Sequence, residues 1–181
     1  MPEWKSFTFG EDGEATPTAE APTPASANPA MEPDEYAAKW GTEVSEVTIA
    51  RIEAVLEGDG LPHGSSEFIA FTQLEDIPFQ VHREPTDAPW AQIETRILPV
   101  GEGHTEASLQ AIANRWNTEP LQPTVFPIES EDGWILVAAS RFFVGEGLSD
   151  RQIHAMLRRG LIIGVSAAQE VPSFFDEASA E

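Results

Sequence analysis

The sequence predicts an α+β fold whose elements follow one another in the order α-β-β-β-α-β-β-α. Two groups of segments, within residues 67–97 and 123–143, show the apolar alternation of half-buried strands. A segment with helical apolar spacing separates the two groups, and other helical segments precede and follow them. The chain has 181 residues, which is enough for one such domain and a tail.

The composition changes near residue 33. Residues 1–33 are rich in Ala, Pro, Thr and Glu and have no apolar set to bury, so we expect a disordered acidic tail. Residues 34–175 are then the folded domain, and residues 176–181 form a short acidic C-terminal tail. The first tail also holds an aromatic cluster, which either packs loosely on the domain or forms an acidic–aromatic motif that docks on a partner: Trp4, Phe7 and Phe9.

The first half of the domain predicts two helices and three strands. A short helix is expected over residues 34–41. A second begins near residue 44 and ends at Gly58, with one apolar stripe: Val44, Val47, Ile52, Val55 and Leu56. Three strands follow over residues 67–74, 77–81 and 91–97. The first two are joined by the tight connection Glu75-Asp76.

The second half predicts a helix, a hairpin and a long final helix. Thr105 can cap a helix whose apolar stripe is Leu109, Ile112, Ala113 and Trp116. Strands over 123–130 and 133–143 are joined by a turn that contains Asp132-Gly133, a hairpin motif. The second of them is apolar on both faces, which is typical of a central strand or an interface. Ser149 to Gln152 form a capping box for a helix that runs to about Gln169, and Phe174-Phe175 are expected to return to the core.

The charge and the missing cysteines exclude several classes of partner and site. A net charge of −21 repels phosphate backbones and anionic membrane surfaces, so we expect neither nucleic acid nor membrane as a partner. Without cysteine there is no disulfide and no thiolate metal site, which fits a reducing cytoplasm. The N-terminus lacks the basic start and apolar stretch of a signal peptide, and the apolar run 160–165 is too short to span a bilayer.

No motif indicates catalysis, a metal or a cofactor. The motifs Gly101-x-Gly103 and Gly145-x-Gly147 lack the lysine or third glycine of a phosphate-binding loop, so we interpret them as turns. The histidines do not occur in closely spaced pairs: His63, His82, His104 and His154. We therefore predict a protein without catalytic, metal-binding or cofactor-binding residues.

One set of residues is a candidate surface for a partner. Arg151, His154 and Arg158 recur at helical spacing on the final helix, beside Arg159. They form either a solvated polar face or a docking strip for an acidic segment. Trp116 and Asn117 also have two interpretations. Either Trp116 packs in the core and Asn117 caps the end of the helix, or both line a groove for a partner.

Two further motifs are Asn114-Arg-Trp-Asn117, followed by Pro123, and the start of the last helix at residues 146–153. Together they resemble the YbjN domain family, whose fold is related to that of type III secretion chaperones. The resemblance covers about residues 45–175 and implies a five-stranded, mostly antiparallel sheet with helices packed against it. It also implies a bacterial protein described as a sensory transduction regulator, without catalytic residues, for which homodimerisation is one possible assembly.

Two functional hypotheses follow from the sequence. The first is a non-enzymatic protein-binding module, chaperone-like or a regulatory adaptor, that holds a client segment by strand addition or in an apolar groove. The second is a small-ligand sensor or enzyme with a carboxylate- and histidine-lined pocket. The second would require a deep pocket that gathers at least two of four residues with shifted pKa values: Glu67, His82, Glu94 and Arg96.

Overall fold

The computed structural model describes residues 39–83, 88–99, 104–118, 122–131 and 133–178, with side chains as far as Phe175, and two strands near the N-terminus. The chain forms two compact units, Met1–Pro33 and Asp34–Glu181.

In the first unit, β1 (Phe7–Phe9) pairs antiparallel with β2 (Ala15–Pro17). Both strands lie within residues 1–33, for which a disordered tail stays a prediction. The rest of that prediction, and the side chains of the Trp4 cluster, lie outside the described residues.

The second unit is built on a six-stranded sheet in which all neighbouring strands are antiparallel. The strands are β3 (His63–Ser65), β4 (Ile69–Leu74), β5 (Ile77–His82), β6 (Trp90–Ile97), β7 (Thr124–Ser130) and β8 (Gly133–Phe143). Their order across the sheet is β3-β4-β5-β6-β8-β7. This confirms the α+β class and the antiparallel sheet. The sixth strand, β3, was not predicted, because it is short, has no apolar alternation and forms only by pairing with β4.

Both predicted hairpin connections are present. Glu75 and Asp76 have positive φ angles of 51° and 64°, as the two central residues of a type I′ turn require. Gly133, with φ of 118°, opens β8 opposite Ser130. The long strand β8 lies between β6 and β7, and residues 135–140 are buried, which explains its two apolar faces.

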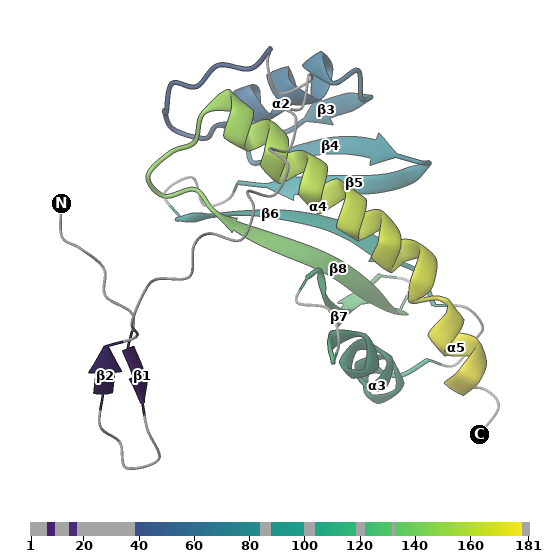
Figure 1. Ribbon diagram of the computed structural model, residues 1–181. Coiled ribbons are helices and arrows are strands. Elements are labelled where there is room, and N and C mark those ends of the chain that lie inside the picture. Colours follow the sequence, from purple (N-terminus) through teal and green to yellow (C-terminus); the bar gives the residue numbers. More distant parts are fainter. Residues whose placement is uncertain are drawn as a thin grey trace. The chain divides into compact units, whose positions relative to one another are not determined.

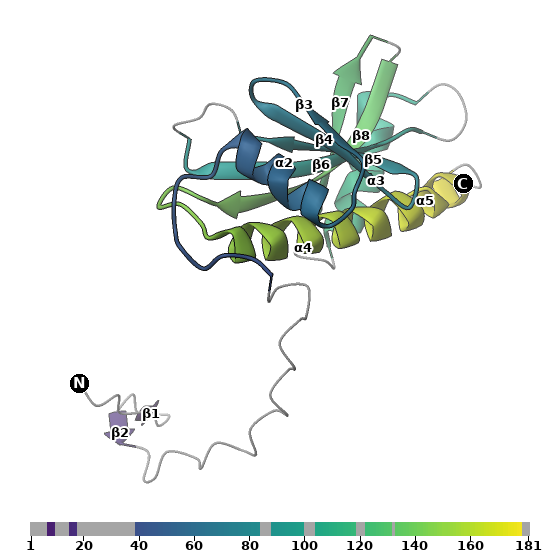
Figure 2. The same ribbon diagram turned by 90° about the horizontal axis from the view of Figure 1, so that it is seen from above.

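The helices cover one face of this sheet. Helix α4 (Asp150–Glu170) crosses the sheet diagonally (Figure 1). It can approach closely because Gly160 and Gly164 face Ile93 and Phe79, so that a Cβ at either glycine would come within 2.5 Å of those side chains. Helix α2 (Ile49–Gly58) lies beside α4 over β3 and β4 (Figure 2), and α3 (Glu106–Asn117) packs on β7 and β8.

The caps of α3 and α4 lie where the sequence placed them. Thr105 and Ser149 accept hydrogen bonds from the backbone N–H groups of Ser108 and Gln152, and both form capping boxes. A short helix, α5 (Ser173–Ala178), returns Phe175 to the core as expected, and this side chain is buried.

The start of α2 corrects the sequence prediction. The helix begins at Ile49, not near residue 44, and Val44 is 56% exposed. The side chain of Thr48 caps the helix, and Arg51 donates to the carbonyls of Ser45 and Glu46, which holds this segment outside the helix. The short helix predicted over 34–41 lies mostly outside the described residues.

Candidate functional site

The cationic strip predicted on α4 is only partly exposed. Arg151, Arg158 and Arg159 lie on the exposed side of the helix. His154 corrects the prediction of a polar helix face, because it is only 4% exposed and its Nδ1 lies 2.8 Å from Asp59 Oδ2 at the end of α2. Helical spacing could not show this, because the neighbours of the His154 ring are distant in sequence: Asp59 lies 95 positions earlier, and the Trp40 ring, 6.0 Å away between centroids, precedes α2.

Trp116 and Asn117 connect α3 to the start of β7. The Trp116 side chain is buried, and its Nε1 donates to the Pro123 carbonyl at 3.0 Å. Asn117 makes a two-way contact with Val125, in which Nδ2 donates to the carbonyl at 2.7 Å and Oδ1 accepts from the N–H at 2.9 Å. The Asn-x-Trp-Asn motif therefore holds the fold together at this point, and a role in binding a partner stays a prediction.

Asn117 also protects an edge of the sheet. The N–H and C=O of Val125 point away from β8, where a further strand would pair, and Asn117 occupies both. Two residues on, Pro127 faces the same way and has no N–H to offer. The opposite edge strand, β3, has only three residues. These features disfavour addition of a partner strand at either edge.

The face of the sheet opposite α4 is the most distinctive surface of the described chain. On β6 the residues Ala91, Ile93, Thr95 and Ile97 are buried toward the helices, so Trp90, Gln92, Glu94 and Arg96 lie on the opposite face. We call this opposite side of the sheet the open face. Strand register places these residues on it as well: Phe71, His82, Phe126 and Arg141.

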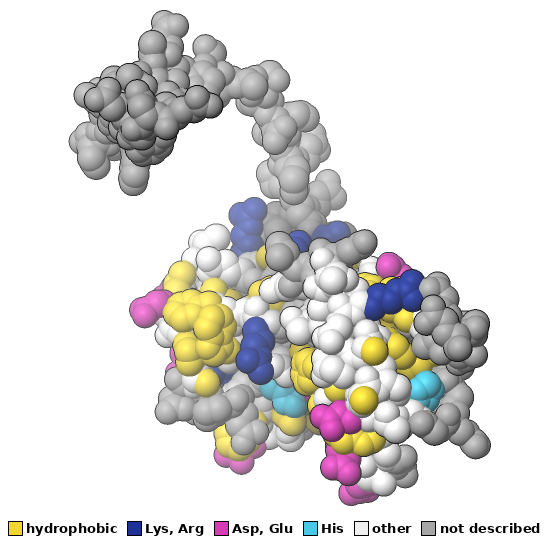
Figure 3. All heavy atoms as spheres, turned by 90° about the horizontal axis from the view of Figure 1, so that it is seen from below, with side chains coloured by type: hydrophobic (Ala, Val, Ile, Leu, Met, Phe, Trp, Pro, Cys, Tyr) yellow, Lys and Arg dark blue, Asp and Glu magenta, His cyan; other side chains and the backbone are white. Residues whose placement is uncertain are grey.

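Large aromatic side chains are exposed on the open face. Trp90 and Phe143 are register partners on β6 and β8, and their rings meet edge to face at 5.5 Å between centroids. They are 49% and 54% exposed, and Phe71 on β4 is 42% exposed. Figure 3 shows a hydrophobic patch beside a basic side chain and a histidine on one described surface. Clustered aromatic exposure of this kind is typical of binding surfaces.

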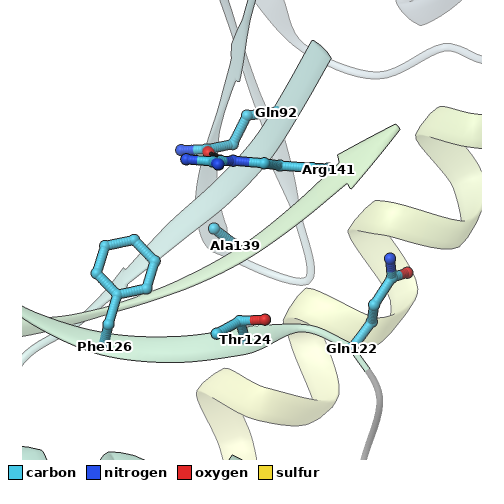
Figure 4. A pocket seen from close by; sticks show the side chains of 6 residues that line it. All are labelled: Gln92, Gln122, Thr124, Phe126, Ala139 and Arg141. Carbon is cyan, nitrogen blue, oxygen red and sulfur yellow. Dashed lines mark hydrogen bonds between the residues drawn. The ribbon is translucent and has the colours of Figure 1, made fainter. Parts of the chain in front are cut away.

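A groove runs along the open face next to these aromatics. One part has a volume of about 450 Å³ and is lined by Gln92, Gln122, Thr124, Phe126, Ala139 and Arg141 (Figure 4). A second part, of about 310 Å³, is lined by His82, Ala88, Trp90, Gln92 and Arg141. Gln92 and Arg141 line both hollows, which therefore lie next to each other, and we call the two together the groove.

A chain of polar contacts crosses three strands along this groove. Arg141 Nε donates to Gln92 Oε1 at 2.7 Å, and Gln92 Nε2 donates to Glu94 Oε2 at 2.6 Å. His82 Nε2 lies 3.1 Å from Glu94 Oε1. Burial by itself raises the pKa of Glu94, but the hydrogen bond and charge of His82, the hydrogen bond from Gln92 and the charge of Arg96 outweigh it and lower that pKa.

Sequence reasoning did not assemble this site. It named His82, Glu94 and Arg96 for a deep pocket, and the structure brings His82 and Glu94 into contact, whereas no contact between Glu67 and this pair is seen among the described residues. Arg141 was not singled out. The alternation of β6 and β8 was the available indication, but the Gln92–Arg141 register needs the pairing of strands 49 residues apart.

Two negative observations apply to the described part of the chain. No group of three or more His, Asp or Glu side chains is arranged there as metal ligands. None of the described helices is long and apolar enough to cross a membrane.

Comparison with known proteins identifies the fold. No family model and no curated protein matches the sequence. Among solved structures, the chain resembles one described as "Crystal structure of YbjN, a putative transcription regulator from E. coli", with a TM-score of 0.56 and 13% identity. The match covers 72% of this chain and 93% of that one. The chain thus has the fold of YbjN, as its two sequence motifs predicted.

Proposed function

We propose that this protein is a non-enzymatic regulatory adaptor that binds a segment of another protein on the open face of its sheet. The observation that carries the proposal is the exposure of Trp90, Phe143 and Phe71 on the face that no described helix covers, where Trp90 also lines the groove. Exposed aromatics of this kind contribute little to folding but supply much of the energy of protein interfaces. The likeness in fold to a protein described as a regulator agrees with this role.

Groove binding is favoured over strand addition. Asn117 and Pro127 protect the β7 edge, and β3 is short, so neither edge of the sheet offers a long row of backbone groups. The open face instead offers side chains, so an extended partner segment would be recognised mainly through its own side chains.

The small-ligand or enzyme hypothesis has one observation in its favour, which is the contact between His82 and Glu94 beside the groove. However, the lowered pKa of Glu94 keeps this carboxylate charged near neutral pH, where it cannot deliver a proton. Glu94 accepts a hydrogen bond from Gln92, which in turn accepts one from Arg141, so Glu94 helps to orient Arg141. We therefore favour a binding role for these residues.

The proposal can be tested with a matched pair of variants of the full chain. Trp90→Ala with Phe143→Ala removes the aromatic pair, and Ile162→Ala removes an equally exposed apolar side chain from α4. Partners are captured from a lysate of the source organism by cross-linking and identified by mass spectrometry. We expect a defined set of partners that the double variant loses and the Ile162 variant keeps.

Two results would overturn the proposal. Identical partners for both variants would place binding elsewhere on the molecule. Conversion of a dimer into a monomer by the double variant, seen by light scattering, would mean that a second copy of the chain occupies the open face. Because these side chains are about half exposed, we expect both variants to stay folded, and urea unfolding of each variant separates a loss of binding from a loss of folding.

A further inference from the structure

The polar chain across the open face orients Arg141 through one hydrogen bond. Its Nε donates to Gln92 Oε1, and Gln92 is itself held because its Nε2 donates to Glu94. His82 lies against the other oxygen of Glu94. Figure 4 shows the guanidinium and the Gln92 amide extended alongside each other over the groove. This hydrogen bond favours one orientation of the guanidinium before a ligand binds, which lowers the entropy lost on binding.

The hydrogen bond to Gln92 uses only one edge of the guanidinium. The two terminal nitrogens remain, and the described residues provide them with no carboxylate. Glu94, the acid on the neighbouring strand, is already engaged by Gln92 and His82. A planar guanidinium with its terminal nitrogens available matches the two oxygens of a carboxylate.

Apolar surface lies on both sides of this cation. The Trp90–Phe143 pair lies at one end of the groove, and Phe126 lines the other part. A ligand that fills the groove would thus meet aromatic surface, then a cation, then aromatic surface again. An extended peptide can place an acidic side chain between two apolar ones along such a path.

The net negative charge of the whole chain affects where an acidic partner can bind. With 31 acids against 10 Lys and Arg, most of the protein repels an acidic partner. The open face differs, because Arg141 and Arg96 both lie on it and Glu94 is engaged by its neighbours. The exposed arginines of α4 form a second positive area, but only the open face combines its cations with exposed aromatic side chains, which favours an acidic segment with apolar neighbours there.

We propose that Arg141 binds an Asp or Glu side chain of an extended partner segment, whose flanking aromatic or aliphatic side chains contact Trp90–Phe143 and Phe126. Gln92 is the positioning residue for Arg141. This inference rests on the proposed function and defines the chemistry of the partner.

The experiment uses random twelve-residue peptides displayed on phage and selected on the immobilised full chain. Peptides that the Trp90→Ala/Phe143→Ala variant still binds are discarded. We expect the remaining peptides to share an acid flanked by large apolar residues. A synthetic peptide of this kind should bind at least tenfold more weakly when its acid is replaced by the corresponding amide, and by a similar factor to Arg141→Gln.

The controls separate recognition from net charge and from folding. Arg159→Gln removes the same charge from an exposed arginine of α4 and should leave the affinity unchanged. Arg141→Lys keeps the charge but not the planar fork, so it should restore only part of the affinity. Gln92→Ala should weaken binding of the acidic peptide but not of its amide form. The amide peptide tests the proposal on the wild-type chain, so the result does not depend on how any variant folds.

The outcomes distinguish this inference from the proposed function. Peptides that need Trp90 and Phe143 but show no preference for an acid, or that bind Arg141→Gln equally well, would overturn the inference and leave the adaptor role intact. If no selected peptide depends on the aromatic pair, both are overturned. An equal loss of peptide affinity in Arg159→Gln would mean that the preference for an acid reflects only the net charge of the protein, and it would also overturn the inference.

Discussion

Asn117 provides the sharpest test of how this fold is held together. Its side chain makes both hydrogen bonds to Val125, whose N–H and C=O lie at a residue with 0% exposure. Asn117→Ala leaves two buried backbone groups without partners, at about 1–3 kcal/mol each. Water that enters the space of the lost amide, and the better helix propensity of alanine, recover part of this cost. We expect a net loss of about 2–4 kcal/mol in the free energy of unfolding.

The assay is urea unfolding of the full chain, followed by tryptophan fluorescence, because Trp116 lies in the adjacent core. Asn114→Ala is the matched control, since Asn114 lies one turn earlier on the exposed side of α3 and accepts one hydrogen bond, from Gln110. It should change stability by no more than about 0.5 kcal/mol. If Asn117→Ala were as stable as this control, the contact with Val125 would not hold the edge strand, and a surface role for Asn117 would be favoured.

Three further predictions concern the open face and the core. The lowered pKa of Glu94 means that its charged form stabilises the fold at pH values above the ordinary pKa of 4.5, and this contribution is lost as the pH falls through the lower folded-state pKa. Glu94→Gln should therefore reduce the loss of stability as the pH falls below 4.5, measured by urea midpoints. Gly164→Ala should destabilise the domain by about 1–2 kcal/mol, because overpacking against the buried ring of Phe79 outweighs the gain of about 1 kcal/mol in helix propensity, and an unchanged or higher melting temperature would contradict the close approach of α4. Asp59→Ala should cost about 1–3 kcal/mol by removing the carboxylate from His154, and an unchanged urea midpoint would show that the contact contributes no net stability.

The parts of the fold that the sequence predicted well depend on local interactions. Thr105 and Ser149 cap helices through hydrogen bonds that span three residues, so their signatures can be recognised in a short segment of sequence. The β7–β8 hairpin likewise depends on a turn and on alternation within a few residues. The order of the elements and the α+β class followed from these local patterns.

The errors occurred where distant segments decide the outcome. Helical spacing predicted that α2 begins near Val44, but Arg51 and Thr48 hold the residues before Ile49 in an irregular segment. The strand β3 has no pattern of its own and forms because β4 pairs with it. His154 has the polarity of a surface residue, yet it is buried, with Asp59 from the end of α2 at its ring.

The candidate site shows the same division. The sequence alone determined that the strands of this protein are amphipathic and that the chain is strongly acidic, because composition and alternation are properties of the residues themselves. Only the tertiary structure decided that the helices cover one face and that strand register aligns Arg141, Gln92, Glu94 and His82 along the other. Register depends on pairing between strands far apart in the sequence, and a shift of one residue in any of these strands would move its side chains to the opposite face of the sheet.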